Sequence, residues 1–143
     1  MTYLLDVNVL IAALDKDHEF HDLVQDWFAR EHSEGWATCP ITENGLIRIF
    51  GHSQYPKGPR SPLLAAQLLA AMIEQGSHEF WPDAISLLHA PGVQLAGVSS
   101  VKRVTDTYLL ALAVAGGGKL ATLDRRLSPD AVHGGAAALH VIG

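Results

Sequence analysis

Short, continuous apolar runs are the feature that most constrains the fold of this chain. They lie at 3–7, 36–40, 93–98 and 119–123, and a candidate fifth lies at 139–142. Strands that are apolar throughout, rather than alternately apolar and polar, are typical of a parallel sheet covered by helices on both faces. The sequence therefore predicts a three-layer α/β domain with a central parallel sheet of four or five strands.

Segments with helical spacing of apolar residues separate these runs. They are 9–14, 18–32, 42–50, 61–75, 83–88 and 105–115. The stretch 51–62 is rich in glycine and proline and is expected to be a loop. Ser61 is expected to cap the helix that follows, with Pro62 in its first turn. The chain of 143 residues has no internal repeat or linker, so one domain over 1–143 is expected.

The composition excludes several classes of protein. No apolar run approaches the roughly 20 residues that a membrane span requires. The N-terminus lacks the features of a signal peptide. Cys39 is the only cysteine, which excludes an internal disulfide and a thiolate metal cage. These features predict a cytoplasmic protein without a membrane partner.

The net charge of −5, taken alone, argues against a nucleic-acid partner. The charges are unevenly distributed, however. Acids crowd residues 1–34, whereas 44–73 contains Arg48, Lys57 and Arg60 and no acid. Because the acidity is regional, it does not exclude a polyanion bound elsewhere on the surface.

Four acids occupy comparable places in the predicted fold. Asp6 and Asp124 follow apolar runs, at the carboxyl ends of expected strands. Glu43 and Asp106 each follow a threonine that is a candidate helix cap, Thr42 and Thr105, and each begins an apolar helix face. Since sites in such folds gather at the carboxyl edge of the sheet, the four acids are expected to converge.

A single acid at such a place ordinarily caps a turn or complements a helix dipole. Four together would repel one another unless a cation lay between them. Oxygen-only ligands favour Mg²⁺ or Mn²⁺ over zinc. We therefore expect Asp6, Asp106 and Asp124 to bind one or two metal ions directly, with Glu43 acting through water or on a second metal.

Two polar residues stand near the strand-end acids. Asn8 and Thr122 could each orient a carboxylate or a bound water, although Asn8 could equally cap the next helix. Basic residues are candidates for a phosphate-binding rim, and Arg125 and Arg126 are favoured because they follow Asp124 directly. The other candidates are Arg48, Lys102 and Arg103. The alternative for each is a solvated surface charge.

Five segments carry a family resemblance, in this order: YLLDVNVLIA, HEFHDLVQDWF, CPITENGLIRIF, VTDTYLLALAV and ATLDRRL. With them the chain resembles PIN-domain ribonucleases, specifically VapC-type toxins of type II toxin–antitoxin pairs. Asp6, Glu43, Asp106 and Asp124 all match the acids of that family. The resemblance implies a Mg²⁺- or Mn²⁺-dependent endoribonuclease that leaves a 5′-phosphate and a 3′-hydroxyl. It also implies a homodimer and a cognate VapB-type antitoxin whose tail lies along the active-site groove.

Two other functions compete with this interpretation. The stretch DVNVL superficially resembles the motif of phosphatases that use a strand-end aspartate as nucleophile, but Asn8 stands where that motif has a second aspartate. A non-catalytic module could instead use an acidic groove to hold a basic peptide. The sequence leaves the RNA substrate and the number of metal ions open.

Overall fold

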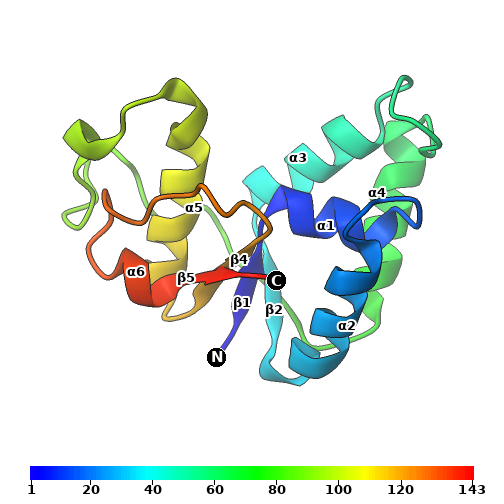
Figure 1. The fold of residues 1–143 in the computed structure, drawn as a ribbon, viewed down its shortest axis with the longest axis horizontal. Coiled ribbons are helices and arrows are strands. Elements are labelled where there is room, and N and C mark those ends of the chain that lie inside the picture. The colour runs from blue at the N-terminus through cyan, green and yellow to red at the C-terminus, as the bar shows by residue number, and fades with distance from the viewer.

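A five-stranded, wholly parallel sheet forms the centre of the molecule (Figure 1), with the strand order β3-β2-β1-β4-β5. The computed structural model describes residues 1–143, except for the side chain of His32. The strands are β1 (Tyr3–Leu5), β2 (Trp36–Thr38), β3 (His78–Phe80), β4 (Lys119–Thr122) and β5 (Leu139–Val141).

Helices cover both faces of this sheet. They are α1 (Val7–Leu14), α2 (His21–Glu31), α3 (Pro40–Phe50), α4 (Pro62–Glu74), α5 (Val104–Ala115) and α6 (Gly135–Ala138). Three 3₁₀ turns accompany them: η1 (His32–Glu34), η2 (Leu95–Gly97) and η3 (Val101–Arg103). Within the described part of the chain, no helix has the length and apolar character to cross a membrane.

Neighbouring strand residues point to opposite faces of the sheet and belong to two separate cores. Leu5 and Trp36 pack with α1, α2, α3 and α4 on one face. Leu4 and Leu120 pack with α5 and α6 on the other. Figure 1 shows these two groups of helices on either side of the sheet. The predicted three-layer α/β architecture is therefore confirmed.

The third strand differs from the prediction. Residues 93–98 form no strand; Val93 makes a single bridge to Val132, and η2 follows. The third strand is instead β3, which pairs with β2 at the sheet edge and is largely exposed. An edge strand needs no apolar run, which is why the pattern of burial does not reveal it. The helix predicted over 83–88 is also wrong, because this stretch has no regular helix.

Helix starts are partly as predicted. Ser61 caps α4, since its Oγ accepts a hydrogen bond from the Leu64 N–H at 3.2 Å. Thr42 is not the cap of α3, which begins at Pro40 after Cys39; its Oγ1 accepts instead from the Cys39 N–H at 2.9 Å. Thr105 is not a cap either, because η3 continues directly into α5.

Candidate active site

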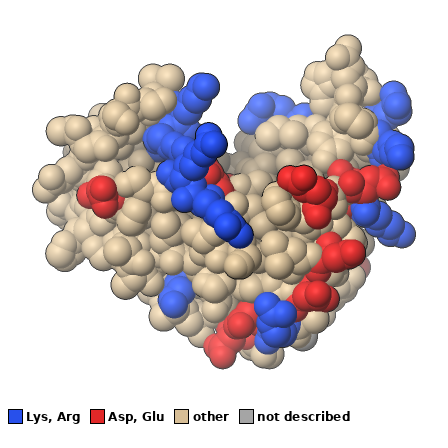
Figure 2. Space-filling model, viewed as in Figure 1, with Lys and Arg blue, Asp and Glu red and all other residues tan. Residues whose placement is uncertain are grey.

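The carboxyl ends of β1 and β4 lie side by side, because these strands pair with Leu5 opposite Ala121. Asp6 follows β1, and its N–H donates to the Ala121 carbonyl at 2.9 Å. Asp124 lies two residues beyond the end of β4. The start of α5 brings Asp106 to the same edge. Figure 2 shows a notch in the molecular surface, with acidic atoms at its base beside a band of basic atoms.

Asp6 is the most buried acid of the site, with 7% of its surface exposed. It is the N-cap of α1: its Oδ1 accepts from the Val7 N–H at 2.8 Å. Its Oδ2 accepts from the Thr122 hydroxyl at 2.8 Å. Burial raises the pKa of Asp6, and the nearby charges of Asp106 and Asp124 raise it further, while the two hydrogen bonds oppose that rise. These three acids therefore form one electrostatic cluster.

Asn8 and Thr122 join α1 to the end of β4. The Thr122 Oγ1 accepts from Asn8 Nδ2 at 3.3 Å and from the Asp124 N–H at 3.1 Å. The Asn8 Oδ1 accepts from the Leu123 N–H at 3.2 Å. Since Asp6 is the N-cap of α1, the interpretation of Asn8 as that cap is wrong. Both side chains hold the two strand ends in place.

Arg103 lies between two acids of the cluster. Its Nη1 donates to Asp106 Oδ2 at 3.0 Å and to Asp124 Oδ2 at 2.7 Å. The Arg126 N–H donates to Asp124 Oδ1 at 2.8 Å. The hydrogen bond from Arg103 is the main cause of a lowered pKa at Asp124, and the same bonds raise the pKa of Arg103. The sequence named Arg103 only as a candidate rim residue, so this contact with the acids is a finding of the structure.

Glu43 belongs to a separate hydrogen-bonded chain. Its Oε2 accepts from the Thr38 hydroxyl at 2.7 Å, and Thr38 Oγ1 lies 2.8 Å from His78 Nε2. The single Thr38 proton is directed at Glu43, so in this arrangement His78 Nε2 is the donor. Burial lowers the pKa of His78, which favours the neutral ring. No hydrogen bond or ion pair between described residues links Glu43 to the other three acids.

The sequence did not single out Thr38 or His78. Thr38 carries a usable signal, because it lies within the strand predicted over 36–40 and precedes Glu43 by five positions. His78 carries none, because its strand was not predicted. The structure thus brings three of the four predicted acids into one cluster and holds Glu43 at the end of the neighbouring strand β2.

Four of the five residues predicted for the basic rim are exposed, and Arg103 is half-buried. Arg48, Lys102, Arg125 and Arg126 are all exposed. A hollow of about 170 Å³ adjoins the acids and is lined in part by Arg103, Asp106 and Arg126. Arg48 lines a different hollow on α3. The structure therefore places Arg126 beside the acids.

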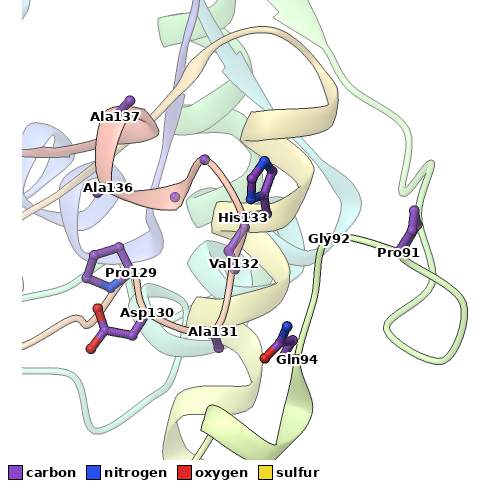
Figure 3. Close-up of a pocket in the computed structure, with 12 residues that line it drawn as sticks. Pro91, Gly92, Gln94, Pro129, Asp130, Ala131, Val132, His133, Ala136 and Ala137 are labelled. Carbon is purple, nitrogen blue, oxygen red and sulfur yellow. The ribbon is translucent and has the colours of Figure 1, made fainter.

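A larger hollow of about 870 Å³ lies away from the four acids, between residues 91–94 and 129–137 (Figure 3). Asp130 and His133 are its only titratable lining residues, and Figure 3 shows them well separated along the loop. Glycine, alanine and proline make up most of the remainder. Its size alone does not make it an active site, because it lacks converging charged groups.

The acid cluster has the donor types that a hard divalent cation takes, since every predicted ligand is a carboxylate oxygen. As the side chains lie, no three described His, Cys, Asp or Glu residues are arranged to hold a metal ion. The Arg103 guanidinium is the cation that two of the acids share. The residues therefore fit a divalent ion by the chemistry of their oxygen donors and by their mutual repulsion, and Arg103 supplies positive charge to two of them.

The PIN domain family profile matches residues 3–129, a span that contains Asp6, Glu43, Asp106 and Asp124. The chain is a PIN domain. This match confirms the resemblance drawn from the five sequence segments, and the parallel sheet agrees with it.

Several Mycobacterium tuberculosis proteins are similar to this PIN domain along most of its length. Ribonuclease VapC44 (strain H37Rv) is 42% identical over 134 residues, covering 94% of each chain. Ribonuclease VapC39 is 43% identical over 134 residues, which are 94% of this chain and 96% of the relative. Ribonuclease VapC29 is 42% identical over 139 residues, 97% of this chain and 96% of the relative. This PIN domain therefore belongs with the VapC proteins.

A solved structure has the same fold. It is the crystal structure of VapBC2 from Rickettsia felis bound to a DNA fragment from their promoter, in which one chain superposes with a TM-score of 0.67. The alignment covers 100% of both chains at 17% sequence identity. At that identity, the similarity shows a shared PIN architecture.

Proposed function

We propose that this PIN domain is a Mg²⁺- or Mn²⁺-dependent endoribonuclease, the toxin of a toxin–antitoxin pair. The observation that carries the proposal is the cluster of Asp6, Asp106 and Asp124 at the carboxyl edge of the sheet, beside exposed arginines. The relatives that are named ribonucleases support the same activity.

Asp6, Asp106 and Asp124 would hold the metal ion, and Glu43 would act through water or on a second ion. When bound, the ion lowers the pKa of water, neutralises charge on the phosphodiester and stabilises the leaving oxygen. The chain's own contribution is to hold the carboxylates before RNA arrives. Thr122 orients Asp6, and Thr38 orients Glu43, each through a hydroxyl hydrogen bond. Such preorganised contacts cost nothing at the moment of reaction.

Exposed arginines beside the acids would bind the RNA backbone. Arg126 lines the hollow next to Asp106, and Arg125 precedes it on the same exposed segment. Lys102 and Arg48 extend the basic surface. These contacts carry no base specificity, because phosphates are the same at every nucleotide. They would fix the strand so that one phosphodiester lies over the carboxylates.

We further propose a VapB-type antitoxin as the natural inhibitor, a homodimer as the assembly, and the cytoplasm as the place of action. The Rickettsia felis protein that shares the fold was solved as VapBC2, which supports the first of these. A basic antitoxin segment would find the same acids that attract a metal ion. No observation favours an aspartyl-phosphate mechanism, since both Asp6 oxygens accept hydrogen bonds and Asn8 is engaged with β4.

Purified protein incubated with a broad RNA panel and Mn²⁺ tests the proposal. We expect cleavage that a chelator abolishes and that Asp106→Asn lowers by roughly 100-fold or more. Asp130→Asn is the matched control, because Asp130 is exposed and lines a different hollow. If no RNA is cut, and Asp106→Asn alters only the binding of a basic peptide, the domain is a binding module instead.

A further inference from the structure

Arg103 occupies two of the three carboxylates that the proposed function assigns to a metal ion. A single nitrogen, Nη1, donates to both Asp106 and Asp124. Asp6, the third acid, has no ion pair in the described part of the chain and is held by neutral donors alone. In the described part of the chain, Arg103 is therefore the one cation that forms ion pairs with these three acids, while the charge of Arg126 acts on Asp124 without an ion pair.

The backbone of Arg103 is held on both sides. Ser100 is the N-cap of η3, and its Oγ accepts from the Lys102 N–H at 3.2 Å. The Thr107 hydroxyl donates to the Arg103 carbonyl at 2.8 Å. Because η3 runs directly into α5, Arg103 and Asp106 are three residues apart on one helical face. Local structure therefore brings the guanidinium to Asp106, and the packing of α5 beside β4 brings it to Asp124.

The side-chain contact itself is of a kind that a competitor can break. Arginine binds carboxylates most strongly as a fork, with two nitrogens on two oxygens. Here both bonds come from Nη1, and the other guanidinium nitrogens make no hydrogen bond to the described residues. The Arg103 side chain is 34% exposed and those of its partners are 22% and 32% exposed, so solvent reaches all three groups. Ion pairs this exposed are individually weak.

We propose that Arg103 competes with the metal ion for the same carboxylates. The Arg103 side chain neutralises Asp106 and Asp124 until a divalent cation displaces it. A divalent ion carries two positive charges and the guanidinium carries one, so the ion would neutralise more of the mutual repulsion among these acids. The displaced side chain remains in the hollow that it shares with Arg126, where both could meet an RNA phosphate. This inference deepens the proposed function and rests on it.

Mn²⁺ binding measured by electron paramagnetic resonance, without RNA, tests the inference directly. We expect Arg103→Gln to tighten Mn²⁺ binding by about three- to tenfold, since two partly exposed ion pairs no longer compete. Lys102→Gln is the control: it removes the same charge from the neighbouring exposed residue, which has no ion pair in the described part of the chain. It should tighten binding less than about twofold.

Thermal unfolding provides a second readout, because a bound ligand stabilises the folded state in proportion to its affinity. The rise in Tm produced by Mn²⁺ should be larger in Arg103→Gln than in the wild type. Arg103→Lys retains the charge but replaces the guanidinium by an ammonium group. Its Mn²⁺-induced rise in Tm should lie between those of the wild type and Arg103→Gln. If Arg103→Gln does not fold, the Lys variant decides the comparison.

The inference is overturned if Arg103→Gln binds Mn²⁺ no more tightly than Lys102→Gln, or if neither the wild type nor Arg103→Gln binds Mn²⁺. Its failure is distinguishable from that of the proposed function because neither readout involves RNA. Tighter binding of Mn²⁺ together with no RNA cleavage would retain the inference and reject the ribonuclease proposal.

Discussion

Asp6 combines two roles in a single side chain. Its Oδ1 starts α1 as the N-cap, and its carboxylate faces Asp106 and Asp124 from a buried position. A cap needs only an acceptor, which serine or asparagine would also supply. The pKa of Asp6 is raised mainly by burial, so the charge is costly in the folded chain. A costly charge at a sheet edge is a mark of function rather than stability.

The raised pKa of Asp6 predicts a pH dependence in metal-free protein. Below about pH 4, near the ordinary value, folded and unfolded chains both bind the proton. As the pH rises through the higher folded pKa, the unfolded state releases the proton first, so this group's contribution to stability is lost. We expect Asp6→Asn to gain in unfolding free energy relative to the wild type between pH 4 and 7, measured by urea denaturation. A difference that is constant with pH would contradict the prediction.

The Thr38 hydroxyl predicts a second effect at the scale of one residue. Thr38 is fully buried and donates to Glu43. Thr38→Val keeps the shape but leaves Glu43 and His78 without this partner, so we expect a loss of about 1–3 kcal/mol in unfolding free energy. RNA cleavage should fall as well, because Glu43 loses its orientation. Thr38→Ser retains the hydroxyl, so this variant should cleave RNA faster than Thr38→Val. Equal cleavage rates for the two variants would show that the hydrogen bond to Glu43 does not contribute to activity.

Two helices approach closely beside the site. At Gly45 of α3, an added Cβ would lie 2.6 Å from Val7 Cγ2 of α1. Glu43 and Asp6 lie at the starts of these same helices. Val7 is β-branched and has little rotamer freedom in a helix, so it cannot easily move aside. The spacing of the two acid-bearing helices therefore depends on a position without a side chain.

Gly45→Ala should push α3 away from α1. We expect a loss of about 1–3 kcal/mol in unfolding free energy from overpacking, together with reduced cleavage. Val7→Ala removes the methyl groups in question, so the double variant should be more stable than Gly45→Ala alone. A double-mutant cycle in chemical denaturation measures this coupling. Simple addition of the two destabilisations would show that the contact does not limit the packing.

Elements with strong patterns were predictable, and those without were not. The apolar runs at β1, β2 and β4 fill both cores, so their burial is visible in the sequence. The edge strand β3 packs on one side only and reads as His-Glu-Phe, which has no strand signature. The run at 93–98 is apolar, yet it packs as a 3₁₀ turn and a single bridge, because backbone pairing depends on which neighbours the chain brings near.

On the scale of the whole molecule, a net charge of −5 coexists with a basic band along the notch (Figure 2). Association with a polyanion depends on the local potential more than on the sum of charges. Acids at the base of the notch would repel RNA unless a cation covered them. The basic band and the acids that we propose to bind a metal ion are therefore complementary parts of one proposed site.

The proposed rim predicts a change in salt dependence. Replacing Arg125 and Arg126 together by glutamine should weaken the binding of single-stranded RNA and reduce the slope of log affinity against log salt by about 1.4, or about 0.7 for each phosphate contact. Fluorescence anisotropy in an inactive Asp106→Asn background measures this. Arg30→Gln, at the end of α2, is the control for loss of a positive charge outside the proposed rim. An unchanged slope would remove both arginines from the interface.

The sequence by itself determined the layered α/β fold, the family, and the four acids at strand ends and helix starts, because these depend on local patterns of apolar and acidic residues. Tertiary structure decided how the acids are paired. Arg103 reaches Asp124, 21 positions away, and Thr122 reaches Asp6, 116 positions away. Contacts across such separations arise from strand order and helix packing, which no local pattern contains. The sequence therefore predicts the acids, while only the fold shows that a guanidinium already lies between two of them.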